Sequence, residues 1–194
     1  MLIMINSMVA KLIEKGMLSD EQKEDYVYGL TIVCEKWIVY SILFLIAIFL
    51  RHPIEGMIFA TAFVSLRQTT GGFHANNFLG CLIGSIVTFF LVIQVGVPLL
   101  IKYRIISFLL VVISTICILV LSPINHPNLA LTGDETRKIK QWNRKVLCIE
   151  LLTVGIGSWL QMCWQQYIIA AIVMCAVFII LAKIIGQEVK DDEE

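Results

Sequence analysis

The feature that most limits what this chain can fold into is a series of apolar runs. Several approach the roughly 20 residues that a helix needs to cross a bilayer. The runs cover residues 31–50, 54–66, 79–100, 105–121, 146–160 and 167–185. Hydrophobic residues make up 58% of the chain and charged residues 15%, so a water-facing surface cannot be covered. The sequence predicts an all-α integral membrane protein with about six transmembrane helices.

We expect one polytopic membrane domain over residues 1–194, with no separate soluble domain. Its parts are a cytoplasmic or interfacial segment over 1–30, membrane helices over 31–185 and an acidic tail over 186–194. No cleavable signal peptide is predicted, because Met1 to Ile5 lacks a basic region and precedes no small-residue cleavage site. The first span is then expected to act as its own insertion signal.

The N-terminal segment carries an amphipathic pattern. Four apolar residues fall on one helical face: Met8, Val9, Leu12 and Ile13. Gly16 then offers a stop. We predict a short amphipathic helix on the membrane surface. A helix packed on the protein without lipid contact is the open alternative.

Local signals predict further helix boundaries. Ser19-Asp20-Glu21-Gln22 reads as a capping box, which opens a helix that continues to Leu50. Arg51-His52-Pro53 predicts a tight turn. The 13-residue run from Ile54 to Leu66 covers roughly 20 Å as a helix, which is short of the ~30 Å hydrocarbon core. The next span is predicted to end near Pro98, and a short basic helix is expected to start near Thr132, ahead of the 146–160 span.

The basic residues are unevenly placed, and this placement predicts the topology. Six spans put both termini on the same side, and a cytoplasmic N-terminus agrees best with the excess of basic residues on inner loops. The inner face then holds Lys11, Lys15, Lys23, Lys36, Arg67, Arg137, Lys138, Lys140, Arg144, Lys145, Lys183 and Lys190, whereas the outer face keeps Arg51, Lys102 and Arg104. We expect a multi-pass protein of the cell membrane with membrane lipids as partners and no nucleic-acid partner.

A polar stretch interrupts the apolar pattern at residues 67–81 and brings an arginine, a histidine and a cysteine together. A thiolate is a far better nucleophile than a thiol, so a working cysteine needs a base or a positive environment. On one straight helix, His74 and Cys81 would lie roughly 10 Å apart, too far for a hydrogen bond. A bend between them is therefore needed for a Cys-His site.

The same stretch contains the residues for such a bend. Gly71-Gly72 permits a bent loop before His74, and Asn76 or Asn77 is a good N-cap. Cys81 would then lie in the first turn of the next span, a position that favours a thiolate. We predict that His74 can fold back over the cysteine.

Other interpretations of these residues stay open at the sequence level. A cysteine in a membrane helix usually serves packing, and Arg67 can anchor a helix end at the headgroups. The six cysteines form no CxxC pair and no zinc-ligand spacing, so we expect no disulfide framework. In the predicted topology, His52 and His126 fall on opposite faces of the membrane. Neither a metal nor a cofactor is predicted.

The spacing of these residues resembles a known family. The motif residues are Arg67, Gly71, Gly72, His74, Ala75 and Cys81. Looser matches are Leu12-Ile13-Glu14-Lys15, Tyr26 with Tyr28-Gly29-Leu30, and Ser122-Pro123 with Pro127-Asn128. Together they resemble the accessory gene regulator protein B family, the membrane peptidases of Gram-positive quorum-sensing systems.

This resemblance implies a cysteine endopeptidase that cleaves a small propeptide and cyclises the product to a thiolactone or lactone. Cys81 would be the nucleophile and His74 the general base and acid. Residues expected to shape the site or contact the substrate are Arg67, Gly71, Gly72, Gln68 and Asn77, with Asn76 a further candidate by its chemistry. The implied substrate is an autoinducing-peptide precursor with an amphipathic N-terminus and an acidic C-terminal tail. A homodimer and an active site facing the cytoplasm are also implied.

A non-enzymatic membrane protein, such as a small transporter or peptide exporter, is the alternative class. Short or broken spans and intramembrane charges such as Glu35 and Glu150 favour it. Glu35 and Lys36 can instead lie at the interface with their charged groups in water. An enzyme acting on lipid phosphates is less favoured, because no acidic metal-binding cluster is present.

Overall fold

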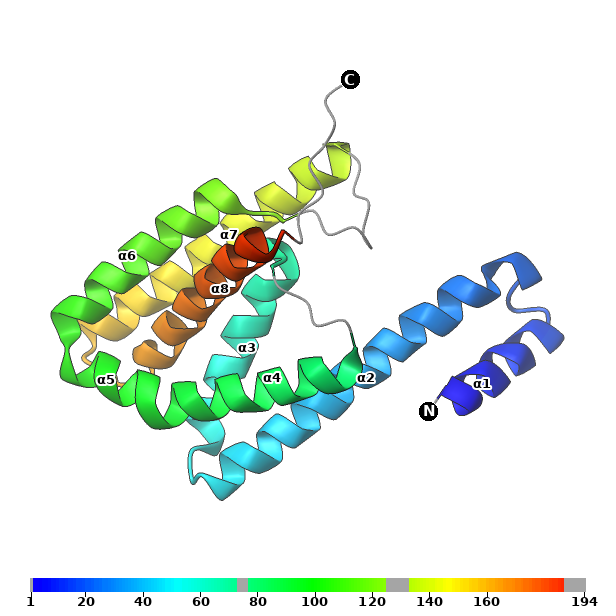
Figure 1. The fold of residues 1–194 in the computed structure, drawn as a ribbon, viewed down its shortest axis with the longest axis horizontal. Helices are drawn as coiled ribbons and strands as arrows, with labels where there is room; N and C mark the ends of the chain where they lie inside the picture. The colour runs from blue at the N-terminus through cyan, green and yellow to red at the C-terminus, as the bar shows by residue number, and fades with distance from the viewer. Residues whose placement is uncertain (1, 73–76, 125–132, 187–194) are drawn as a thin grey trace. The chain divides into compact units, whose positions relative to one another are not determined.

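The computed structural model describes residues 2–72, 77–124 and 133–186, and every regular element in these ranges is helical (Figure 1). The elements are α1 (Leu2–Glu14), η1 (Asp20–Gln22), α2 (Lys23–Phe49), α3 (Pro53–Thr70), α4 (Phe78–Leu91), η2 (Val92–Gly96), α5 (Val97–Lys102), α6 (Arg104–Leu121), α7 (Gly133–Trp159) and α8 (Gln165–Ile185). The predicted all-α class is confirmed.

Four helices in the described ranges are long and apolar enough to cross a membrane. They are α2, the continuous helix Phe78–Lys102, α6 and α8. This agrees with a membrane protein, while six spans and two cytoplasmic termini stay predictions. By internal contacts, the chain divides into residues 1–45 and 46–194. The single membrane domain also remains a prediction.

In the first unit, α1 begins at Leu2, six residues before the predicted amphipathic stretch. Ile5 and Val9 are its buried residues. The helix stops as predicted: Gly16 adopts a positive φ of 70° and donates its amide N–H to the carbonyl of Ile13 at 2.8 Å. Glycine adopts this backbone region without steric cost.

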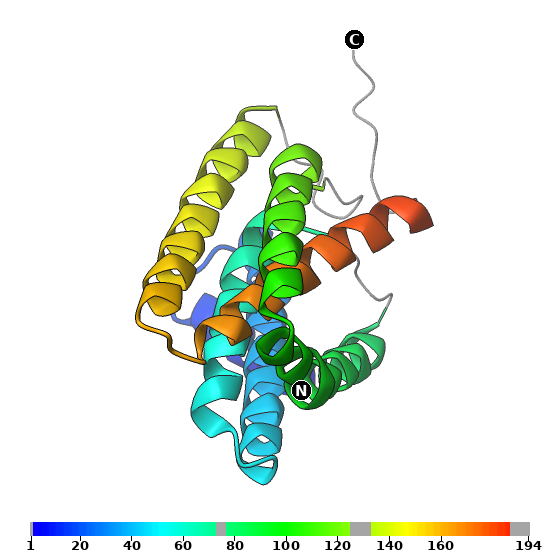
Figure 2. The same ribbon diagram turned by 90° about the vertical axis from the view of Figure 1, so that its left-hand side faces the viewer.

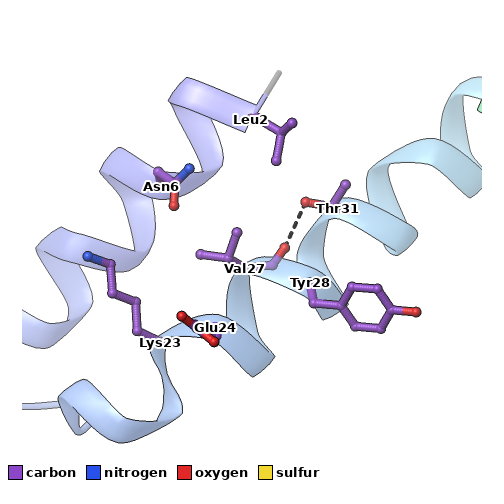
Figure 3. A pocket seen from close by; sticks show the side chains of 7 residues that line it. All are labelled: Leu2, Asn6, Lys23, Glu24, Val27, Tyr28 and Thr31. Carbon is purple, nitrogen blue, oxygen red and sulfur yellow. Dashed lines mark hydrogen bonds between the residues drawn. The ribbon is translucent and has the colours of Figure 1, made fainter. Parts of the chain in front are cut away.

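The capping box also forms within this unit. The side chain of Gln22 accepts a hydrogen bond from the Ser19 amide at 3.5 Å, and the short turn η1 leads directly into α2. A groove lies between α1 and the start of α2 (Figure 3). It is lined by Leu2, Asn6, Lys23, Glu24, Val27, Tyr28 and Thr31.

In the second unit, the predicted turn at Arg51-His52-Pro53 is present. Arg51 has a φ of 62°, and Pro53 is the first residue of α3, where its missing N–H has no intrahelical partner to lose. Helix α3 runs past the apolar segment and includes Arg67. The polar stretch therefore begins as helix, and the chain leaves it only at Gly71.

The predicted span over 79–100 is present, although its end lies four residues beyond Pro98. The helix continues from Phe78 to Lys102, and Pro98 lies inside it. A proline removes one backbone donor and clashes with the carbonyl four residues earlier. The π-helical turn η2 precedes it, and the Val97 amide donates to the carbonyl of Val92, five residues back. The wider turn accommodates the proline without ending the helix.

The short basic helix predicted near Thr132 is not separate. Helix α7 is continuous from Gly133 to Trp159, so its polar first half runs directly into the predicted 146–160 span. The residues at 137–145 have side chains that suit a helix. The sequence changes from polar to apolar near Val146, but the helix does not end there.

Helices α3 and α8 pack side by side and run in the same direction (Figures 1 and 2). The Cys175 thiol lies 3.6 Å from the Phe63 carbonyl oxygen, and one turn further along, Arg67 lies over Phe178. Helix α6 is parallel to them, since Ser107 near its start donates to Gln166 near the start of α8 at 2.7 Å. These three helices therefore end at the same end of the unit.

Candidate active site

The candidate site begins where α3 ends. Gly71 has φ 67° and ψ −149°, and its amide donates to the Arg67 carbonyl at 3.2 Å. Gly72 follows with φ 116°. L-residues rarely adopt these angles, and a Cβ at position 71 would lie only 2.7 Å from the Ile124 carbonyl oxygen. The predicted bend at the glycine pair is confirmed, because backbone geometry and close packing both require glycine there.

The Arg67 side chain is turned into the protein. Its guanidinium Cζ lies 5.5 Å from the centroid of the Phe178 ring, within the range of a cation–π interaction. Burial lowers the pKa of Arg67, and the nearby thiols of Cys175 and Cys81 act in the opposite direction. The arginine thus lies within electrostatic reach of the predicted nucleophile.

Cys81 lies in the first turn of α4, as predicted. Of the two asparagines considered for the N-cap, Asn77 takes this position, and its side-chain oxygen accepts the Gly80 amide at 2.7 Å. The Cys81 amide makes the first helical hydrogen bond, to the Asn77 carbonyl at 3.1 Å. The Cys81 residue is exposed, so an approaching carbonyl group can reach this turn.

A buried polar network supports the α3 end of the site. Asn143 of α7 accepts a hydrogen bond from the Thr69 hydroxyl at 3.1 Å and donates one to the Ser122 hydroxyl. Directly beside it, the Ile124 amide donates to the Thr70 carbonyl at 3.1 Å. The segment after α6 is therefore attached to the last turn of α3, immediately before the glycine pair.

The structure brings some predicted site residues together. Arg67 and Gly72 lie against each other at the end of α3, Cys81 lies in the first turn of α4, and Gln68 is exposed. His74 and Asn76 lie outside the described residues, as do His126, Pro127 and Asn128. The proximity of His74 to Cys81 therefore stays a prediction.

Three residues at or near this site were not assigned to it from the sequence: Phe178, Asn143 and Glu150. Phe178 lies in a uniformly apolar span, and Asn143 lies within a basic segment, so neither position carries a local signal. Glu150 is 7% exposed, and neither carboxylate oxygen has a hydrogen-bond partner in the described part of the chain. In the sequence, Glu150 is recognisable as a glutamate within an apolar run, and this pattern favours the transporter alternative.

The described residues contain no group of three or more histidine, cysteine or acidic side chains that could hold a metal ion. All six cysteines are free thiols. The chemistry available at the described part of the site is therefore that of an exposed thiol and a partly buried cation.

These features define a helical membrane protein with an exposed thiol at a helix start and a partly buried arginine at the end of the preceding helix. The sequence model of the Accessory gene regulator B family matches residues 5–186, nearly the whole chain. The chain belongs to this family, which is involved in quorum-sensing peptide processing. No curated protein and no solved structure matches the chain at a significant level.

Proposed function

We propose that the protein is a membrane cysteine endopeptidase that removes the C-terminal tail of an autoinducing-peptide precursor and cyclises the product. The observation that carries this proposal is the exposed Cys81 in the first turn of α4, whose thiol acts to raise the pKa of the partly buried Arg67. Membership of the family supports a peptide substrate. The sequence places His74 between these two residues, as the candidate base.

In the first step, the Cys81 sulfur attacks the scissile carbonyl carbon while His74 takes the thiol proton. The tetrahedral intermediate collapses, the C–N bond breaks, and His74 gives the proton to the departing amine of the tail. The product is a thioester between Cys81 and the new C-terminus of the peptide. The positive charge of Arg67 suits the anionic intermediate.

In the second step, a cysteine or serine side chain within the bound peptide attacks the thioester carbonyl. The new ring is a thiolactone or a lactone, and the Cys81 sulfur regains its proton. Exchange of one thioester for another is nearly isoenergetic, so a thiolactone needs no separate energy source. Water must be kept from the acyl-enzyme, and a site below the membrane surface would help to do so.

The proposed substrate carries an amphipathic N-terminus, suited to the membrane surface, and an acidic tail. Five basic residues on the first half of α7 lie at the end of the bundle where α3 ends, and all five are exposed: Arg137, Lys138, Lys140, Arg144 and Lys145. They support an inward-facing site in the cell membrane. We also propose a homodimer, which only the resemblance to the family implies. The glycine pair and Asn77 shape the site, and Gln68 is a substrate contact.

Co-expression with the propeptide from the neighbouring reading frame tests the function. Mass spectrometry should find cleaved, cyclic peptide with the native protein and none with Cys81→Ala or His74→Ala. Cys148→Ala and Cys163→Ala are matched controls, because both cysteines are exposed and are expected to be dispensable. Cyclic product from Cys81→Ala would overturn the proposal.

A small transporter or peptide exporter is the second candidate, favoured by the buried Glu150. Ionisable residues inside membrane proteins often mark ion or substrate pathways. Peptide flux into proteoliposomes that survives alkylation of Cys81 and is lost in Glu150→Gln would support transport. Absence of flux, together with covalent trapping of Cys81 by a peptide thioester, would support the peptidase.

A further inference from the structure

The Arg67 guanidinium is held between two surfaces that come from different parts of the chain. On one side lies the Phe178 ring of α8, with 5.5 Å from Cζ to the ring centroid. On the other lies Gly72, where an added Cβ would stand 2.5 Å from Arg67 Nη1 and 3.1 Å from the Phe178 carbonyl oxygen. Any side chain at position 72 would therefore clash with the Arg67 guanidinium in this position.

The Phe178 ring is itself packed against a second aromatic ring, that of Phe63. Its centroid lies 5.8 Å from that of Phe63, with the two rings tilted by 56°. Phe63 stacks in turn on Phe59 at 5.7 Å. The Phe178 ring therefore offers the guanidinium a face that is supported by two further rings.

The direction of that charge matters for the site. Burial lowers the pKa of Arg67, and the thiols of Cys175 and Cys81 both act to raise it. Cys175 is fully buried and lies 3.6 Å from the Phe63 carbonyl oxygen, so it packs within the bundle. Cys81 is the exposed one of the two, and it is the thiol that a substrate can reach.

We propose that Phe178 is a positioning residue for the reaction at Cys81, holding the Arg67 guanidinium by a cation–π contact so that its charge faces the reacting sulfur and carbonyl. This inference rests on the proposed peptidase function. An aromatic face attracts the guanidinium through its quadrupole, whereas an aliphatic side chain of similar volume fills the space without orienting the charge.

The test is a substitution series at position 178 in the full-length protein, read as single-turnover cleavage of the propeptide. Phe178→Tyr and Phe178→Trp should keep the native rate within about twofold, because both retain an aromatic face. Phe178→Leu should lower the rate by about 3- to 20-fold with little change in peptide affinity. Equal rates for the leucine and tyrosine variants would overturn the proposal.

Fluorinated phenylalanines at position 178 keep the proposal testable if Phe178→Leu does not fold. Successive fluorines weaken the quadrupole while nearly preserving the shape of the ring. The cleavage rate should fall stepwise with fluorine number. A flat series would show that the ring serves packing alone and would overturn the inference.

Two controls separate this inference from the function on which it rests. Phe59→Leu removes a ring that is 3% exposed and packs on Phe63 and Phe89, so it measures the effect of lost aromatic packing. In an Arg67→Ala background, Phe178→Leu should add less than twofold, because there is no charge left to position. A full additional effect contradicts the positioning role, whereas activity in Cys81→Ala contradicts the peptidase itself.

Discussion

The hydroxyl of Thr69 donates a hydrogen bond to the side-chain oxygen of Asn143 at 3.1 Å, although the two residues are 74 positions apart. Asn143 is 1% exposed and also donates to Ser122. One amide therefore joins the end of α3, the end of α6 and the first half of α7 at the level of the candidate site.

Asn143→Leu should destabilise the protein by about 1–3 kcal/mol, because two buried hydrogen bonds between the helices would be lost. The Thr69 and Ser122 hydroxyls would each keep only a backbone carbonyl of their own helix, at Leu66 and Ile118. Thermal unfolding in detergent checks this as a lower Tm. Gln141→Leu, at an exposed position of the same helix, is the matched control and should change Tm little. An unchanged Tm in Asn143→Leu would show that the network adds no stability.

Gly71→Ala and Gly72→Ala should both lower cleavage activity, for related reasons. Each residue has a positive φ, and an added Cβ would meet the Ile124 carbonyl at position 71 or the Arg67 guanidinium at position 72. We expect a cost of roughly 1–3 kcal/mol each from backbone strain alone. Stability and single-turnover rate are the measurements.

The control for the glycine variants is Gly84→Ala in α4. No atom lies within 4 Å of its added Cβ, and its φ is not in the positive region. Alanine is favoured over glycine in a helix by about 1 kcal/mol, so this variant should be neutral or more stable. Equal loss at positions 72 and 84 would contradict a specific role for Gly72.

Asn77→Ala should loosen the helix turn that carries Cys81, because the side-chain cap on the Gly80 amide is lost. A lost N-cap costs typically about 1 kcal/mol. The rate of Cys81 alkylation and the cleavage rate should both change, whereas Asn77→Asp and Asn77→Ser should behave like the native protein. Identical behaviour of the alanine and serine variants would argue against the cap.

Glu150→Leu should raise stability by roughly 1–3 kcal/mol if the residue is only structural, since it removes a buried carboxyl that has no hydrogen-bond partner in the described chain. Glu150→Gln keeps a polar group and should gain less. Thermal unfolding provides the comparison. A stabilised leucine variant that still cyclises peptide would exclude an essential role for Glu150 in the peptidase reaction.

The topology is testable by chemical labelling in a background without native cysteines. A membrane-impermeant maleimide should label Lys102→Cys in intact cells and Lys138→Cys only after permeabilisation. Both positions are exposed and lie at opposite ends of the bundle, next to the start of α6 and near the start of α7. The reversed pattern would place the candidate site outside the cell.

The helices were largely predictable, because local chemistry sets their ends. Gly16, the Ser19 capping box, Pro53 and Asn77 each mark a boundary that the structure confirms. The differences arose where the hydropathy pattern or a proline predicts a helix end that the backbone does not have. At Pro98 a wider helical turn accommodates the missing donor, and in α7 the polarity changes while the helix continues.

At the candidate site, the bend and the helical position of Cys81 followed from glycine conformation and capping. The partners of Arg67 did not, because its contact with Phe178 joins helices far apart in the chain. Nothing in an apolar span distinguishes one phenylalanine from another. Such contacts depend on the parallel packing of α3 and α8, which sequence periodicity does not determine.

The π-helical turn at Val92–Gly96 has one further consequence. An extra residue within a helix rotates everything beyond it by roughly 100° about the axis. The segment that carries Cys81 is therefore rotated about the helix axis relative to the segment that packs on α6 and α8. Removing one residue from this turn would turn the thiol to a different side of the bundle while leaving the local sequence around it intact.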